Sequence, residues 1–137
     1  MDRRKNRQKG FTLIEIIAVL IILGILAAVA VPKFMGLQEE AKKKAAQSLV
    51  GSAQSQLSME YAKKLLEENG NTNNTWTYLT TDPNPQKICD KVTKDGYEDY
   101  DLSCTAVGDD KIEIKVKVKN SNEELATGNF TNPGSTS

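Results

Sequence analysis

The feature that most constrains this chain is an apolar run from Phe11 to Val31, 21 residues with a single charged side chain, Glu15. As a helix rising about 1.5 Å per residue, the run is roughly 30 Å long, which is the thickness of a bilayer's hydrocarbon core. The aliphatic residues after Glu15 leave no polar face, so in water every side of the helix must be buried. The run therefore predicts a helix that can span a membrane.

The residues before the run form a short basic leader. Residues 1–10 contain five Lys and Arg side chains against one acid, Asp2, a formal charge of +4. Basic residues beside an apolar span resist translocation. The leader is therefore predicted to stay in the cytoplasm, while everything after Pro32 lies outside.

The composition excludes most enzyme classes. The chain has no His and only two Cys, so imidazole bases, imidazole zinc ligands and the usual Ser/His and Cys/His nucleophile pairs are absent. The sequence also lacks a Gly-rich phosphate loop and a G-x-S-x-G elbow. We expect no enzymatic activity, cofactor or metal site, and no nucleic-acid binding is inferred.

The junction between leader and run reads Lys9-Gly10-Phe11-Thr12-Leu13-Ile14-Glu15. With the basic leader before it and the aliphatic run after it, this string resembles the processing signature of type IV prepilins and type II secretion pseudopilins. Gly24, Pro32 and the helix beyond also match, so the resemblance covers about residues 5–60. The rest of the chain is not similar enough to name a subfamily.

The resemblance implies a processing step and a set of partners. A prepilin peptidase in the inner membrane would cut between Gly10 and Phe11 and methylate the new N-terminus, Phe11. Removing the leader leaves 13 basic and 17 acidic residues, a formal charge of −4. The mature chain would then join a helical homopolymer through a filament assembly machinery and reach the cell surface.

Glu15 is the residue of the run that most needs a role. A carboxylate inside a transmembrane helix costs about 2.5–3.5 kcal/mol on insertion scales, so it requires a partner or a proton. The resemblance implies that Glu15 pairs with the N-terminal amine of Phe11 in a neighbouring subunit. A residue tolerated near the membrane interface is the alternative.

Gly24 and Pro32 mark a weak point in the helix. Proline removes a helical hydrogen bond and disfavours helical geometry at the residue before it. We expect a kink or an unwound segment between Gly24 and Pro32, and the resemblance implies that this segment melts during assembly. A plain bend at the membrane exit is the alternative.

Residues 33–69 are predicted to continue the helix in amphipathic form. Four-residue spacing drifts about 40° per step, so the apolar stripe winds around the helix. Such a helix suits contacts with a globular head on one side and neighbouring helices on another, and an ordinary core-facing helix is the alternative. The stripe consists of Leu37, Ala41, Ala45, Leu49, Ala53, Leu57, Tyr61 and Leu65. After it, Asn69-Gly70 predicts the end of the helix.

A small β head is predicted over residues 70–119. Residues 111–119 alternate Lys or Glu with Ile or Val, which indicates a strand with one buried face. Gly108-Asp109-Asp110 reads as a hairpin loop, which makes residues 102–107 the partner strand. We also expect a short extended piece at 76–79, a loop at 82–85 and a loose polar tail at 120–137.

A head of about 50 residues buries little apolar surface, so we expect a covalent cross-link to stabilise it. A Cys89–Cys104 disulfide would close a loop of about 15 residues, worth roughly 3 kcal/mol in the chain-entropy estimate. Oxidation is permissible outside the membrane, and two free buried thiols are the alternative. The acidic loop Asp95 to Asp101 is read as solvated rather than as a calcium site.

The predicted fold is α+β, type IV pilin-like: a long N-terminal helix, apolar in residues 11–32 and amphipathic in residues 33–69, packed against a small antiparallel sheet. The predicted function is a structural filament subunit, with a pseudopilin of a type II secretion system as the alternative. A secreted binding module is less favoured, although Ala28-Val29-Ala30 resembles a signal-peptidase site near Ala30. A membrane-anchored enzyme lacks the required groups.

Overall fold

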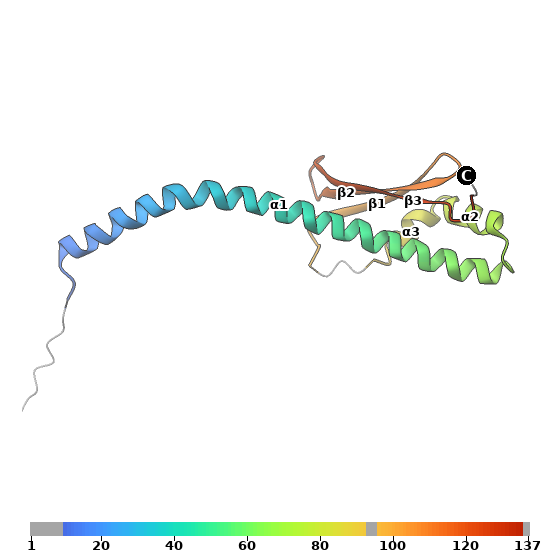
Figure 1. Cartoon of the computed structure of the whole chain (residues 1–137), viewed down its shortest axis with the longest axis horizontal. Coiled ribbons are helices and arrows are strands. Elements are labelled where there is room, and N and C mark those ends of the chain that lie inside the picture. Colours follow the sequence, from blue (N-terminus) through green and yellow to red (C-terminus); the bar gives the residue numbers. More distant parts are fainter. Residues whose placement is uncertain (1–9, 93–95, 136–137) are drawn as a thin grey trace, which may run out of the picture. The chain divides into compact units, whose positions relative to one another are not determined.

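The computed structural model describes residues 10–92 and 96–135. Three helices precede three strands along the chain (Figure 1). The chain divides into two units, one ending at Glu39 and one beginning at Glu40. Helix α1 (Leu13–Glu67) runs through both.

Helix α1 is unbroken from Leu13 to Glu67, with Pro32 inside it. In the isolated chain the segment between Gly24 and Pro32 is therefore helical and not unwound, and the kink expected there stays a prediction. The helical hydrogen bonds on either side hold the turn although proline contributes no N–H. Melting of this segment during assembly stays a prediction.

The predicted helix stop is confirmed. The Gly70 N–H donates to the Leu65 carbonyl (2.8 Å) and the Asn69 N–H donates to the Leu66 carbonyl (3.3 Å). Asn69 has a φ of 53° and Gly70 a φ of 84°. These are the paired bonds of a Schellman motif, which satisfy the last carbonyls of a helix.

The second half of α1 supplies one wall of the head's core. Of the four-spaced stripe, Leu49, Ala53, Leu57 and Tyr61 are buried, as predicted for a face against a head. The first two stripe positions, Leu37 and Ala41, are exposed. Ala46 and Val50 are buried although they lie off the stripe, because a 3.6-residue period also places i+3 and i+4 neighbours on one face.

The sheet has the order β1-β2-β3 with both pairings antiparallel. The predicted hairpin is confirmed: β1 (Tyr100–Val107) pairs with β2 (Lys111–Val118) through the turn at 108–110. Ile112, Ile114 and Val116 of β2 are fully buried. The alternating pattern of β2 thus places its apolar side chains in the core opposite α1 and its charges outward.

The loose tail predicted at 120–137 is wrong. Strand β3 (Glu124–Thr131) lies within it and pairs along β2, with a register shift beside Lys117. The polar, Gly-containing sequence hides the strand because β3 is an edge strand in which exposed and half-buried residues are equally common. The head therefore extends beyond residue 119.

The extended piece predicted at 76–79 is also wrong, because this segment belongs to helix α2 (Thr72–Thr80). Asn71 caps α2 by accepting the Asn74 N–H at 3.0 Å. Trp76 and Leu79 are buried, and the Trp76 indole N–H donates to the Asp109 carbonyl at 2.7 Å. Tertiary packing of these large side chains decides the helix where short-range propensity is ambiguous.

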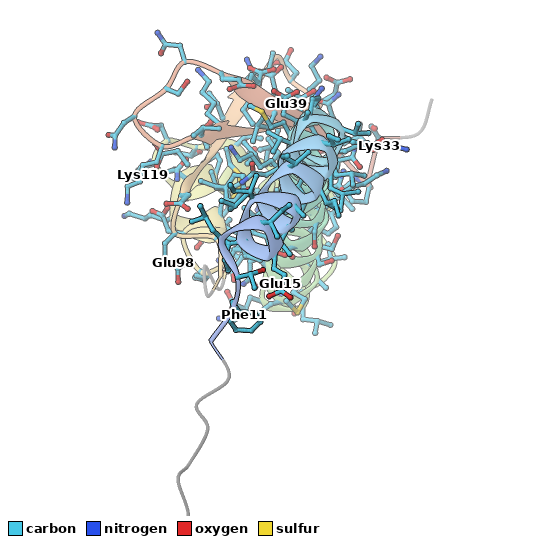
Figure 2. The ribbon with its side chains drawn as sticks, turned by 90° about the vertical axis from the view of Figure 1, so that its left-hand side faces the viewer. Phe11, Glu15, Lys33, Glu39, Glu98 and Lys119 are labelled. Atoms are coloured by element: carbon cyan, nitrogen blue, oxygen red, sulfur yellow. A yellow bond between two sulfur atoms is a disulfide. The ribbon has the colours of Figure 1, made fainter. Side chains whose placement is uncertain are left out.

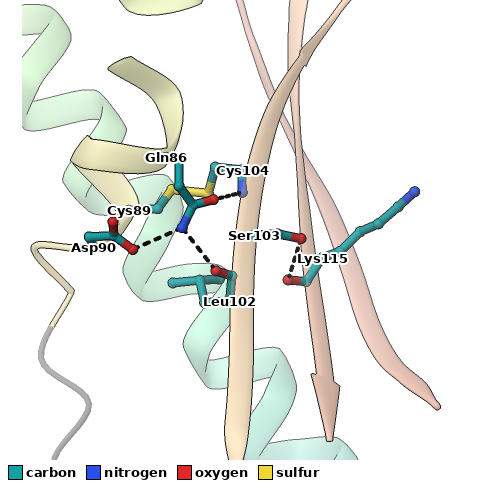
Figure 3. Close-up of a disulfide and its surroundings, with 7 residues drawn as sticks. All are labelled: Gln86, Cys89, Asp90, Leu102, Ser103, Cys104 and Lys115. Atoms are coloured by element: carbon teal, nitrogen blue, oxygen red, sulfur yellow. Dashed lines mark hydrogen bonds between the residues drawn. A yellow bond between two sulfur atoms is a disulfide. The ribbon is translucent and has the colours of Figure 1, made fainter. Parts of the chain in front are cut away.

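The loop predicted at 82–85 is only partly correct, since helix α3 (Asn84–Cys89) begins within it. Pro85 sits in the first turn, where the absent N–H costs nothing. The Cys89–Cys104 disulfide is confirmed and joins α3 to β1 (Figure 3). Beside it the Gln86 side chain accepts the Cys104 N–H at 2.9 Å and donates to the Leu102 carbonyl at 3.2 Å. One side-chain amide thereby covers the free edge of β1.

Candidate functional site: the start of the apolar helix

Thr12 and Glu15 form a reciprocal hydrogen-bonded pair at the start of α1. The Thr12 N–H donates to Glu15 Oε2 at 2.9 Å, and the Glu15 N–H donates to Thr12 Oγ1 at 3.4 Å. This is a capping box, which satisfies N–H groups that a helix start leaves without partners. The carboxylate also lies at the positive end of the helix dipole.

Phe11 and Glu15 lie together at this end of the helix. Figure 2 shows their side chains projecting from its N-terminal turn, and with Ile16, Val19 and Leu20 they line a shallow, mainly apolar groove. The Phe11 side chain is 83% exposed. A neighbouring chain could therefore reach both Phe11 and Glu15.

The predicted cleavage position has the exposure that a protease needs. Gly10 is exposed, precedes the helix, and has nothing within 4 Å of the position a Cβ would occupy. The rest of the predicted leader, residues 1–9, lies outside the described residues.

The surface of the apolar half of α1 is exposed on all sides. Within residues 11–37 every large hydrophobic side chain is exposed. By length and composition α1 is the helix of the described chain that could cross a membrane, and no part of its apolar window is buried. So much exposed apolar surface requires lipid or other protein around it.

The head offers no candidate metal site in the part of the chain that the structure describes. Among those residues no cluster of three or more potential metal-ligating side chains occurs. In the acidic loop, Asp95 lies outside the described residues. Hydrogen bonds from its own N–H and from the Gly96 N–H lower the pKa of Glu98. The Glu98 carboxylate therefore binds main-chain N–H groups of its own loop.

The structure brings together Phe11 with Glu15 and Cys89 with Cys104, and leaves Gly24 and Pro32 within the helix. Sequence reasoning missed the local partner of Glu15. The signal was present, because Thr12-x-x-Glu15 before an apolar run has the spacing of a capping box. Glu15 thus has a helix-starting role in the isolated chain in addition to any role between chains.

Comparisons with known proteins point to one family. The family described as "Prokaryotic N-terminal methylation motif" matches residues 5–31. The chain is 49% identical over 55 residues to the type II secretion system core protein G of Dickeya chrysanthemi, a match that covers 40% of this chain and 36% of the relative. No solved structure shows a significant match to this chain.

Two further relatives extend the picture. The core protein G of Escherichia coli is 42% identical over 57 residues, which is 42% of this chain and 39% of the relative. The type IV narrow pilus major component PilA5 of Thermus thermophilus is 54% identical over 37 residues, which is 27% of this chain and 32% of the relative. The matches thus span between 32% and 39% of these relatives' lengths. They support the family of type IV pilins and type II secretion pseudopilins, whose printed names are not those of enzymes.

Proposed function

We propose that this chain is a prepilin-type subunit that is cut after Gly10, methylated at Phe11, and polymerised through α1 into an extracellular type IV pilus-like filament. The observation that carries the proposal is the exposed apolar surface of α1 with one carboxylate, Glu15, next to the future N-terminus. In the precursor, lipid of the inner membrane covers this surface, the leader is cytoplasmic and the head is periplasmic. In the filament, the α1 helices of neighbouring subunits cover it.

Cleavage prepares the chain for leaving the membrane. The leader carries a formal charge of +4 that anchors it on the cytoplasmic side. A cut after Gly10 by a prepilin peptidase removes these charges and keeps the whole apolar helix. It also creates an ammonium group at Phe11, four residues from the Glu15 carboxylate.

Glu15 then links assembly to the new N-terminus. Among the described residues of a single subunit, the Glu15 carboxylate accepts its hydrogen bond from the Thr12 N–H, in a segment where an ionised group is costly. A neighbour's Phe11 ammonium neutralises the charge, and neither group then remains buried and unpaired. The two charged groups therefore have a lower free energy when paired between subunits than in separate subunits in the membrane, and this difference favours polymerisation.

A pseudopilin of a type II secretion system is the second candidate, because relatives at 42% and 49% identity carry the name core protein G. Both candidates share the processing and the helix-mediated polymerisation. Electron microscopy of cells expressing the tagged chain distinguishes them, since a pilus extends visibly from the surface at ordinary expression.

The role of Glu15 is tested with two substitutions that separate charge from helix capping. Glu15→Ala removes both the carboxylate and the bond to the Thr12 N–H. Glu15→Gln keeps a side-chain acceptor for that N–H, as capping boxes accept Glu or Gln, but removes the charge. The readouts are filament yield by shearing and sedimentation, and the cleaved form in the membrane fraction.

We expect both variants to be inserted and cleaved, and both to lose at least 90% of the wild-type filament yield. A control, Glu123→Ala, removes an exposed carboxylate from the head and keeps the wild-type yield. Filaments from Glu15→Gln but not from Glu15→Ala would reduce Glu15 to a helix cap. Wild-type yields from both would refute the pairing role.

A further inference from the structure

A block of opposite charges lies on α1 just beyond its apolar part. It reads Glu39-Glu40-Ala41-Lys42-Lys43-Lys44, and all six side chains are exposed. Glu40 and Lys44 have the i, i+4 order that favours an ion pair within a helix. Among the residues that the structure describes, however, none of the four ion pairs involves this block. Its charges are thus available to another chain.

Glu40 and Lys44 face away from the head. Nine residues turn a helix by about 900°, which is half a turn beyond two full ones. Glu40 lies nine residues before buried Leu49, and Lys44 lies nine residues before buried Ala53. Lys42 differs, because it lines a groove of about 240 Å³ with Asp99 and Tyr100 of the head.

In a filament built through α1, the face of the helix opposite the head points toward the filament axis. Neighbouring subunits then present this same face to one another around the axis, where water is scarce. A carboxylate or ammonium there must find an opposite charge, because a charge left unpaired in such a place is costly. Glu40 and Lys44 can supply that charge only if the axial shift between subunits brings them level.

The proposed pairing at the start of the helix sets such a shift. The pairing places Phe11 of one subunit level with Glu15 of the next. One subunit is then shifted along the filament axis by the length of four residues, which is about 6 to 10 Å because they are partly extended and partly helical. The four residues from Glu40 to Lys44 span about 6 Å of helix. The same shift in the same direction therefore brings Glu40 of one subunit level with Lys44 of the other, within reach of two long side chains.

We propose that Glu40 of one subunit binds Lys44 of its neighbour, a second ion pair in the filament with the register of the Phe11–Glu15 pair. The occupant of this face of α1 is a second copy of the chain. Glu39 and Lys43 repeat the spacing one position earlier. The inference rests on the proposed function and adds to it a contact that fixes the axial register.

Charge reversal tests the contact, with co-expression to separate contacts between chains from those within one. Glu40→Lys produces a chain with two cations at these positions, and Lys44→Glu produces a chain with two anions. Each variant alone should give at least tenfold less sheared filament than the wild type. The two variants expressed together with different epitope tags should recover at least half of the wild-type yield, with both tags in one filament.

Matched controls keep the outcomes distinct. Glu123→Lys and Lys63→Glu make the same charge changes at exposed positions of the head and of α1, and should leave the yield unchanged. A repulsion within one helix would persist in the mixture, so failure of the mixture to recover overturns the proposed contact, as do normal filaments from either variant alone. Absence of filaments from the wild-type chain would instead overturn the proposed function, and this inference with it.

Discussion

At Gly128, strand β3 packs so close to α1 that there is no room for a side chain. A Cβ at this position of β3 would overlap Val50 Cγ1 of α1 and lie 3.4 Å from Gln54 Nε2. Val50 is 7% exposed, and a β-branched side chain on a helix has one strongly preferred rotamer. It cannot turn aside, so Gly128→Ala must push β3 away from α1.

The cost follows from two opposing terms. Overpacking a well-packed core costs roughly 1–3 kcal/mol, while replacing glycine in a strand with alanine returns about 0.5–1 kcal/mol of chain entropy. We expect a net loss of about 1–2 kcal/mol in the free energy of unfolding of the head. For a domain of this size that is a fall in Tm of roughly 4–16 °C.

The assay is guanidinium unfolding of the full chain in detergent, followed by Trp fluorescence. The chain has one Trp, and Trp76 lies 6.1 Å from Phe130 of β3 between ring centroids. Gly51→Ala is the matched control, since nothing lies within 4 Å of its Cβ position and alanine favours a helix. Adding Val50→Ala to Gly128→Ala should recover part of the loss through the space it frees. Equal or higher stability of Gly128→Ala alone would refute the close packing of β3 on α1.

Three other predictions concern the head. Replacing Cys89 and Cys104 with Ser should cost about 3 kcal/mol of unfolding free energy, as expected for a separation of 15 residues, and thiol counting on the denatured, unreduced wild type should find no free thiol. Gln86→Ala should cost roughly 1–3 kcal/mol, measured by the same unfolding assay, because two main-chain groups of β1 lose their partner. A hydrogen bond from Lys64 lowers the pKa of Glu68, so the ion pair is present at neutral pH and is lost as the pH falls through that lowered pKa. Lys64→Met should therefore raise the Glu68 pKa in an NMR titration. An unchanged pKa would contradict the pairing.

Patterns that depend on local chemistry were predictable from the sequence. The apolar run, the stop at Asn69-Gly70 and the alternation in β2 each follow from one physical requirement that the residues meet on their own. The disulfide followed from the need to stabilise a small head outside the membrane. The same kind of signal was available for the Thr12–Glu15 capping box, which sequence reasoning overlooked.

Elements that depend on distant partners were not predictable. Strand β3 exists because β2 offers a free edge and Gly128 allows close approach to α1, and neither fact is written in its own polar sequence. Helix α2 depends on the burial of Trp76 in the core, next to Phe130 of β3. The continuity of α1 through Pro32 has a different cause: the long helix on both sides outweighs one lost hydrogen bond, which a rule about a single proline does not include.

The intact mass of the subunit in sheared, washed filaments tests the central claim most directly. We expect a chain that begins at Phe11, carries the mass of one added methyl group, and lacks residues 1–10, with the Cys89–Cys104 disulfide formed. A subunit that begins near Val31 would indicate an ordinary signal peptide. A chain that still begins at Met1 would contradict processing after Gly10 and with it the proposed route from membrane to filament.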